Sequence, residues 1–519
     1  MPVMRRGRRF FTIILILGCG VLWLRHYSRL PSLDGRTVSS AVNETRETQL
    51  GHVVAPLLEA HPNVSGIFPL RDARDAFAAR MRLAQRAERT LDVQYYIWRN
   101  DMTGTLLFQA LHDAADRGVR VRLLLDDNNT SGLDSILAAL DSHPDIEVRL
   151  FNPFVIRKPR IGYLTDFFRA NRRMHNKSFT ADNQATIIGG RNIGDEYFGA
   201  TEGVIFVDLD VLAIGPVVHD VSTDFDRYWN SASSYSVDKL LPRVTAEQLE
   251  DLTAAARRIE ATPADIDFVN AVRESPFMQQ LVARTLQFEW ANTHMISDDP
   301  AKGLGRAKQE ELFPERLKKI IGQPTTELEL VSAYFVPTDA GVKSFVDFAK
   351  GGIKVKILTN ALEATDVPAV HAGYAKHRKE LLKGGVQLYE LRRVSATDMR
   401  GKHIGVWGSS GSSLHAKTFA VDGSRVFVGS FNFDPRSAKL NTELGFVIES
   451  PALAQDIERT FATRVPNHAY EVHLSNKGQL CWIAHDSDRT VRYHKEPGTT
   501  FWLRAFVWLL SLLPIDSFL

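Results

Sequence analysis

The chain has 519 residues, of which 44% are hydrophobic and 24% are charged, the proportions of a globular protein with two or three domains. A formal net charge of +2 excludes a strong overall attraction to nucleic acid, so any cationic binding surface has to be local. Only two cysteines are present, Cys19 and Cys481, which excludes a scaffold built on disulfides.

Residues 1–30 combine arginines with an apolar run. Four arginines precede the largely apolar residues 10–24, and another arginine follows them. The run is short for a hydrocarbon core of ~30 Å, and no A-x-A cleavage site comes after it. We therefore favour an uncleaved N-terminal anchor over the alternatives, which are a signal peptide, a lipobox at Cys19 and a twin-arginine signal. The arginine excess before the run predicts a cytoplasmic N-terminus, with the rest of the chain on the other side.

The first large unit, residues 65–232, follows a polar tether predicted over residues 31–64. Its pattern predicts a helix over 70–88, a strand over 91–98, a helix near 105–116 and a strand over 119–127. Strand, helix and strand in this order form a βαβ unit with a parallel sheet.

Near its end this unit carries the pattern H-x-K-x4-D-x6-G-G-x-N, which consists of His175, Lys177, Asp182, Gly189, Gly190 and Asn192. On a strand, H-x-K places both side chains on one face. The imidazole can act as a nucleophile or as an acid and base, and the ammonium can neutralise a phosphoryl oxygen. The Asn offers amide donors to the same oxygens. The Asp precedes a turn, so we assign it mainly to structural support of this otherwise catalytic motif.

A basic and aromatic segment, residues 151–174, leads directly into this motif. It holds six Arg and Lys residues against one acid, Asp166, with Tyr and Phe between them. We favour a lip that meets anionic headgroups, with Arg172 and Arg173 as binding residues, over a solvated surface loop.

The segment that follows, residues 233–325, is predicted to be mainly helical. A capping box at Thr245 and Gln248 begins a helix that reaches to about residue 261, and a second helix is predicted over 275–285. A strand is expected over 288–296, before a turn at 298–302.

The second large unit, residues 326–475, repeats the first in order and spacing. Residues 328–341 match 91–104, and the motif returns as His415, Lys417, Asp422, Gly429, Ser430 and Asn432. At ordinary residue frequencies one copy arises by chance in roughly one chain of this length in a hundred thousand. The chain is therefore an internal duplication, and we expect both motifs to meet in one cleft. Asp422 also precedes a turn and is assigned mainly to structural support.

Two carboxylates occupy matched positions after the motifs. Glu443 lies 28 residues after His415, and Asp208 is its counterpart in the first unit. Either carboxylate could accept a hydrogen bond from the second nitrogen of a motif His, although Asp210 is expected on the same strand face as Asp208. Gly190 stands where the second motif has Ser430, so the site is expected to be asymmetric.

Residues 360–415 contain His371, Tyr374 and Arg378 at helical spacing. They form either an exposed polar face or a surface that selects headgroups, with His371 and Tyr374 as its binding residues. Residues 408–413 are expected to form a flexible loop. In the C-terminal tail, residues 476–519, an apolar segment predicts either an interfacial helix or packing on the body.

The two complete motifs resemble those of the phospholipase D superfamily, whose members combine both motifs in one metal-free phosphodiesterase site. The resemblance covers roughly residues 65–519. Within the superfamily, the chain is similar to bacterial C-type cardiolipin synthases in residues 91–98, 298–302, 332–338 and 441–443. This implies an α/β fold of two similar halves, each a mixed β-sheet flanked by helices, with one shared active site and with no metal or cofactor. It also implies that His175 attacks phosphorus, that His415 serves as acid and base, and that Glu443 orients a motif His.

The resemblance further implies a function in phospholipid metabolism at the bacterial inner membrane. The expected reaction transfers a phosphatidyl group from a phospholipid donor to phosphatidylglycerol through a phosphohistidine and makes cardiolipin; phosphatidylethanolamine is the alternative lipid substrate. Other hypotheses are a phospholipase D that releases phosphatidic acid, a phosphodiesterase acting on nucleic acid, and a catalytically silent membrane scaffold. The near-neutral charge disfavours nucleic acid as a partner, and the two complete motifs disfavour the scaffold.

Overall fold

The computed structural model describes residues 29–513, apart from 161, 202–203, 246–253, 255–262, 284, 394–412 and 487–488, together with a few positions between 15 and 27. Among these described residues, none of the helices combines the length and the apolar character needed to cross a bilayer. Most of the predicted anchor over 1–30 lies outside the described residues, as do most of the helix expected after Thr245 and most of the loop over 408–413.

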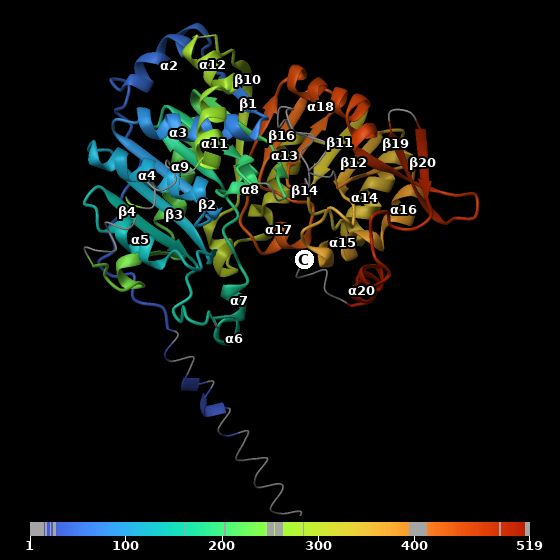
Figure 1. Ribbon diagram of the computed structural model, residues 1–519, viewed down its shortest axis with the longest axis horizontal. Coiled ribbons are helices and arrows are strands. Elements are labelled where there is room, and N and C mark those ends of the chain that lie inside the picture. The colour runs from blue at the N-terminus through green and yellow to red at the C-terminus, as the bar shows by residue number, and fades with distance from the viewer. Residues whose placement is uncertain are drawn as a thin grey trace, which may run out of the picture.

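The first half is a mixed sheet with helices packed against it (Figure 1). Its three parallel strands are β2 (Thr90–Ile97), β3 (Arg120–Asn129) and β4 (Ile146–Phe151). The motif hairpin joins antiparallel to β2 and is followed by β8 and β1; these strands are β5 (Ser178–Ala181), β6 (Ala185–Gly189), β8 (Asp210–Ile214) and β1 (Ser65–Leu70). The helices include α3 (Ala73–Arg86), α4 (Met102–Asp116), α5 (Asp134–Asp141) and α9 (Pro216–Trp229).

The second half repeats this arrangement. Its strands β11 (Glu327–Ser332), β12 (Lys354–Asn360) and β13 (Gln387–Leu391) are parallel. The second motif hairpin and its neighbour are β15 (Lys417–Val421), β16 (Arg425–Gly429) and β17 (Leu444–Glu449). The remaining strands are β18 (Ala469–Leu474), β19 (Leu480–Asp486) and β20 (Arg489–Tyr493), and the helices include α14 (Thr338–Lys350), α15 (Pro368–Ala375), α16 (Arg378–Lys383), α17 (Pro435–Lys439) and α18 (Pro451–Thr463). The predicted duplication is therefore confirmed.

One strand from the segment between the repeats joins the two halves into a continuous sheet. This strand, β10 (Glu289–Ser297), pairs with β1 around Ala291 and with β17 from Asn292 onward. It was expected over 288–296. The helices α11 (Pro263–Arg273), α12 (Pro276–Val282) and α13 (Phe313–Ile321) complete the segment. A second, shorter connection is the parallel pair of β7 (Phe206–Val207) and β14 (Ser413–Leu414).

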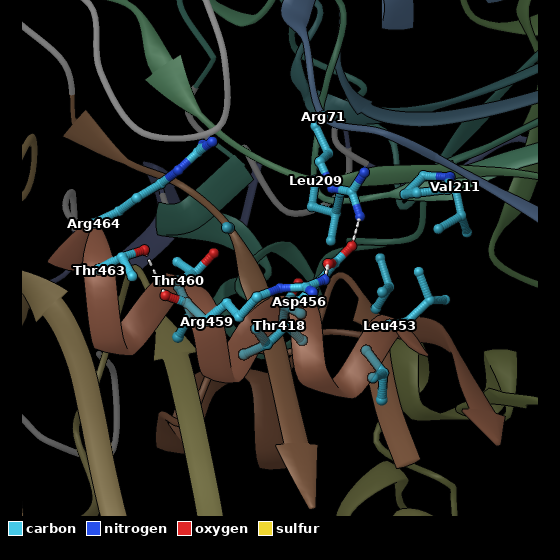
Figure 2. Close-up of a pocket in the computed structure, with 16 residues that line it drawn as sticks. Arg71, Leu209, Val211, Thr418, Leu453, Asp456, Arg459, Thr460, Thr463 and Arg464 are labelled. Carbon is cyan, nitrogen blue, oxygen red and sulfur yellow. Dashed lines mark hydrogen bonds and ion pairs between the residues drawn. The ribbon is translucent and has the colours of Figure 1, made fainter. Parts of the chain in front are cut away.

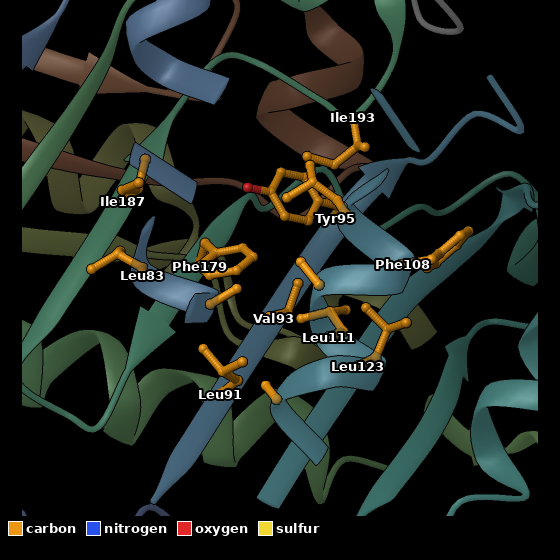
Figure 3. Close-up of a cluster of buried hydrophobic side chains, with 14 of the residues drawn as sticks. Leu83, Leu91, Val93, Tyr95, Phe108, Leu111, Leu123, Phe179, Ile187 and Ile193 are labelled. Carbon is orange, nitrogen blue, oxygen red and sulfur yellow. The ribbon is translucent and has the colours of Figure 1, made fainter. Parts of the chain in front are cut away.

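The largest core cluster of the first half lies between one face of β2 and the helices α3 and α4. Val93 and Leu123 from the strands pack with Phe108 and Leu111 of α4, and Phe179 of the motif hairpin packs close to Val93 (Figure 3). Full burial of such a side chain contributes ~1.5–3 kcal/mol, so this packing holds the motif strands firmly against the parallel sheet.

The prediction of a tether over residues 31–64 is wrong, because parts of this segment are folded against the first half. The Arg36 guanidinium donates to the main-chain oxygens of Asn230, Ser231 and Ser234, just after α9. Residues further along form the helix α2 (Gln49–Ala60). The polar composition of this segment suggested a free linker. Instead, the Arg36 side chain donates hydrogen bonds to main-chain carbonyl groups at the end of α9.

Candidate active site

The two motifs meet because each motif histidine is hydrogen-bonded through its main chain to the other half. The amide of His175 donates to the carbonyl oxygen of Thr442 over 2.9 Å, and the amide of Thr442 donates to Arg173 over 2.9 Å. On the other side, the amides of His415 and Ala416 donate to Val207 over 2.8 and 2.9 Å. Both imidazoles therefore lie at the junction of the halves.

Each imidazole is also held by a carboxylate from the opposite half. Nδ1 of His175 lies 2.9 Å from Glu443, and Nδ1 of His415 lies 2.6 Å from Asp208. All four side chains are almost completely buried. Since Nδ1 of each ring is bonded to a carboxylate, Nε2 is the nitrogen that remains for chemistry. The sequence suggested both carboxylates, but it did not predict this exchange between halves.

The strand expected to carry both Asp208 and Asp210 is interrupted, and this explains why the two residues have different surroundings. Asp208 lies between β7 and β8, while Asp210 is the first residue of β8. Asp210 forms buried ion pairs with Arg80 at 2.8 Å and with Arg191 at 3.5 Å. The expectation that the two Asp residues share a face of one strand is therefore wrong.

Two lysines supply positive charge to the same buried space. The ammonium groups of Lys177 and Lys417 donate to the carbonyl oxygens of His175 and His415, respectively. Burial lowers the pKa of Lys177 to about 7, with Glu443 opposing this effect and Lys417 adding to it. Burial, followed by the charges of Lys177 and Lys417, holds the pKa of His175 well below its ordinary value. The charges of each His-Lys pair therefore act on the pKa values of the other pair.

The two carboxylates differ in their proton affinity. Burial raises the pKa of Glu443 to about 7, against the opposing effects of Lys177 and Ser430. Burial acts in the same direction on Asp208, but the charge and hydrogen bond of His415 outweigh it, and the pKa of Asp208 is about 2. At neutral pH Asp208 is therefore ionised, whereas Glu443 is divided between its two forms.

The expected asymmetry between Gly190 and Ser430 is visible at these carboxylates. The Ser430 hydroxyl donates to Glu443. A Cβ added at Gly190 would lie 2.1 Å from an oxygen of Asp208, so no side chain fits there. The other motif glycines also permit close approach: a Cβ at Gly189 or at Gly429 would lie 2.6 Å from the Cα atom of the neighbouring strand.

The motif asparagines have different surroundings. Asn192 accepts a hydrogen bond from the amide of Ile97 over 3.1 Å and donates to the Tyr197 hydroxyl over 3.0 Å. Asn432 is buried, and its side-chain oxygen has no hydrogen-bond partner among the described residues. The amide nitrogen of Asn192 carries a second hydrogen, beyond the one given to Tyr197, that could serve an anionic ligand.

Aromatic rings line both imidazoles, and the motifs themselves did not indicate this. The ring of Tyr96 meets that of His175 at a centroid distance of 4.9 Å, and the rings of Tyr197 and Phe206 lie 5.2 and 5.1 Å from that of His415. The apolar surroundings strengthen electrostatic interactions in the site. The pair Tyr95-Tyr96 at the end of β2 was a signal for one of these rings.

Asp182 and Asp422 lie at the turns of the hairpins rather than beside the imidazoles. Asp182 accepts hydrogen bonds from the amides of residues 88–90, and Asp422 from those of residues 325–327. Each carboxylate thus ties its motif hairpin to the strand next to it, in agreement with mainly structural support.

Three of the predicted substrate-binding residues are packed in the interior. The Arg173 guanidinium donates to the main chain of Ala170 and Asn152, and His371 pairs with Arg378. Tyr374 donates to Glu390 over 3.1 Å. All three side chains are buried and hydrogen-bonded within the protein, so their contact with a headgroup stays a prediction, and Arg378 begins α16 rather than continuing the helix of His371 and Tyr374.

The predicted lip over residues 151–174 contains both paired, partly buried residues and exposed ones. Arg157 pairs with Asp127 at 2.7 Å and with Asp134 at 2.6 Å, so its charge is already compensated. Arg172 is partly exposed and donates to the carbonyl oxygen of Lys439 over 3.1 Å, a contact with the second half. By contrast, Phe168 is 82% exposed. The exposed surface of this segment is thus more aromatic than basic.

Within the described part of the chain, the acidic and histidine side chains close enough to share a metal ion are His112, Asp113 and Asp116. They lie on or next to the surface of α4 and belong to neither motif, so they give the candidate site no metal ligands.

Comparison with known proteins agrees with this geometry. A family model described as "Cardiolipin synthase, PLD-like domain" matches residues 81–229 and again residues 317–465. The chain is 52% identical over 471 residues to a protein named cardiolipin synthase C from Escherichia coli (strain K12), covering 90% of this chain and 99% of that protein. It is 32% identical over 476 residues to a protein of Helicobacter pylori (strain ATCC 700392 / 26695), covering 90% and 92% of the two chains. A phosphatidylserine synthase from Haemophilus influenzae Rd KW20 shares the fold, with a TM-score of 0.57 at 13% identity and coverage of 90% and 100%.

Proposed function

Because the chain belongs to the family of cardiolipin synthases with PLD-like domains, we propose that it is a phosphatidyltransferase that makes cardiolipin. In the proposed reaction, a phospholipid donor gives its phosphatidyl group to the headgroup hydroxyl of phosphatidylglycerol. The observation that carries the proposal is the pair of imidazoles at the junction of the halves, each with Nδ1 bonded to a buried carboxylate. Two histidines of opposite protonation state are what a double displacement at phosphorus requires.

In the first step, Nε2 of His175 attacks phosphorus. A nucleophilic imidazole has to be neutral, and the pKa of His175 is held well below its ordinary value by burial and the lysine charges. As the phosphorus–nitrogen bond forms, the bond to the leaving alcohol breaks, and its oxygen takes a proton from Nε2 of His415. The ionised Asp208, 2.6 Å away, stabilises the protonated form of His415 before this transfer.

In the second step, the roles reverse. His415, now neutral, takes the proton from the hydroxyl of phosphatidylglycerol, and the resulting oxygen attacks phosphorus while the bond to His175 breaks. Lys177, Lys417 and the amides of the two motif asparagines hold the phosphoryl oxygens in both steps. The aromatic rings around the imidazoles favour an acceptor brought in by an apolar lipid over bulk water, which supports transfer rather than hydrolysis.

We also propose that two exposed apolar surfaces hold this site against the bacterial inner membrane, in addition to the predicted N-terminal anchor. The helix α20 (Phe501–Ser511) packs on Leu362 and Ala372 through Val507, while Trp502 and Trp508 on its surface are 77% and 64% exposed. The short helices α6 (Gly162–Thr165) and α7 (Phe167–Ala170) project from the same end of the molecule (Figure 1). Exposed aromatic residues of this density are typical of a membrane interface.

The reaction can be tested with the purified full-length protein in vesicles of phosphatidylglycerol, with and without phosphatidylethanolamine, and with products resolved by mass spectrometry. We expect cardiolipin from the wild-type protein and none from His175→Ala or His415→Ala. Release of phosphatidic acid alone would assign the protein to the hydrolases. Absence of lipid turnover in both vesicle types would contradict the proposal.

The membrane surface has its own test. Replacing Trp502 and Trp508 together by Asp should reduce turnover in vesicles while leaving turnover of short-chain substrates in detergent unchanged. Equal turnover of the variant and the wild-type protein in vesicles would exclude α20 as a contact with the bilayer.

A further inference from the structure

A cavity of about 360 Å³ lies between the two halves, beside α18 (Figure 2). Leu209 and Val211 of the first half and Val331, Val428 and Leu453 of the second half give it aliphatic walls. Its volume is near the lower end of the ~300–1,000 Å³ that is usual for small-molecule sites, which suits a single aliphatic chain.

The opening of this cavity has more positive than negative charge. Arg71, Arg459 and Arg464 lie at it, and Asp456 is the acid among the lining residues. Asp456 is shared, because both Arg71 and Arg459 pair with it. Figure 2 shows Arg71 reaching down to Asp456 from the first half, with Arg464 extended from the end of α18.

Arg464 has no acidic partner among the residues that the structure describes, and its side chain is exposed. Burial lowers the pKa of Arg71, and the charges of Arg464 and Arg459 lower it further, against the opposing effect of Asp456. The cluster therefore contains uncompensated positive charge beside an apolar cavity, and an anion bound there would relieve the repulsion.

The cavity also borders the segment that carries the second motif. Ala416 and Thr418 line it, whereas His415 and Lys417, on alternate positions, point toward Asp208 and the candidate active site. A ligand in the cavity would thus lie directly behind the second motif and would be separated from the reacting groups by one strand.

From the aliphatic walls and the cationic opening, we infer that this cavity is an accessory binding site for an anionic amphiphile with one aliphatic chain. The chain lies between the halves along Leu209, Val331 and Leu453, and a phosphate or carboxylate head group lies between Arg71 and Arg464. This site is separate from the phosphoryl-transfer site, and binding to it requires no turnover.

The test is photolabelling of the full-length protein with lysophosphatidic acid that carries a diazirine at the end of its acyl chain. We expect saturable labelling in peptides from residues 416–428 and 451–464. Unlabelled lysophosphatidic acid or dodecanoate should compete, which distinguishes the phosphate head group from the carboxylate, and either result supports the shared chemistry. Competition by inorganic phosphate alone would overturn the role of the chain, and labelling that does not saturate would overturn the site.

Two variants test the cationic opening and the apolar cavity separately. Arg464→Glu reverses the unpaired charge, and Thr460→Trp fills the cavity; each should reduce the saturable labelling of 451–464 by tenfold or more. Lys354→Glu, the same change of charge at an exposed residue of β12, should leave it unchanged. All three proteins should be compared by thermal unfolding. Labelling that survives both cavity variants, or that is confined to peptides of the first motif, would refute the inference.

Discussion

Replacing Asp208 by Asn tests whether an ionised partner of His415 is needed for catalysis. The substitution preserves the size of a fully buried side chain and removes its charge, 2.6 Å from Nδ1 of His415. A hydrogen bond to a charged group contributes ~1.5–3 kcal/mol, and each ~1.4 kcal/mol changes a rate tenfold. We therefore expect kcat to fall by about 10- to 150-fold, with little change in KM, because the lost interaction stabilises the protonated imidazole rather than bound lipid.

The pH dependence gives this prediction a second readout. Burial and the charge of Lys417 hold the pKa of His415 below its ordinary value, against the opposing effect of Asp208. Without the carboxylate the pKa of His415 falls further, so fewer molecules carry the proton that the leaving oxygen needs. The loss of rate should accordingly be larger at pH 8 than at pH 6.

The matched control is Asp210→Asn, two residues away. Asp210 pairs with Arg80 and Arg191 and not with an imidazole, so this variant should lose stability but keep the kcat of its folded fraction. The assay is cardiolipin formation in vesicles, measured by mass spectrometry alongside thermal unfolding. A folded Asp208→Asn protein with the wild-type kcat and pH profile would refute the positioning role of Asp208.

Three further predictions follow from the asymmetry of the site and from the motif turns. Gly190→Ser should abolish activity, because its Cβ would lie 2.1 Å from Asp208, whereas Ser430→Gly should reduce kcat by less than about tenfold because it removes one hydrogen bond; equal effects in a cardiolipin assay would contradict this. Glu443→Gln should have a small effect at pH 6 and be increasingly harmful above pH 7, since the pKa of Glu443 is about 7 and its carboxylate becomes the major form only above that value; a loss independent of pH would count against it. Asp422→Ala should lower the free energy of unfolding by about 1–2 kcal/mol in urea titrations, because it removes the acceptor of two exposed amides and one partly buried amide, and an unchanged midpoint would exclude the structural role.

The duplication and the two motifs were predictable because they are local in sequence. The spacing of His175 and Lys177, the glycine pair at the end of β6 and the βαβ order all follow from side-chain alternation and short connections. The same reasoning placed Asp182 at a turn, where it accepts amide hydrogen bonds from residues 88–90. These features depend on neighbours along the chain, which a sequence displays directly.

What could not be predicted depends on contacts between distant segments. Arg173 was expected to meet substrate as part of the basic segment that leads into the first motif, and His371 as part of a polar helix face. In the fold, Arg173 donates to Asn152, and His371 pairs with Arg378 and Glu496, the latter from the C-terminal tail. A buried charge with distant partners and an exposed charge with none look alike in sequence.

The exchange of carboxylates between halves explains why the duplicated motifs are not equivalent. In the proposed mechanism one imidazole has to be neutral to attack, and the other has to carry a proton for the leaving oxygen. Asp208, ionised and without a hydroxyl neighbour at Gly190, favours the protonated form of His415. Burial raises the pKa of Glu443, and its carboxyl oxygen accepts a hydrogen bond from Ser430. Glu443 therefore stabilises the protonated form of His175 less than Asp208 stabilises that of His415. Because each carboxylate is supplied by the opposite half, neither half contains a complete site, and a change at position 190 or 430 alters the histidine of the other repeat.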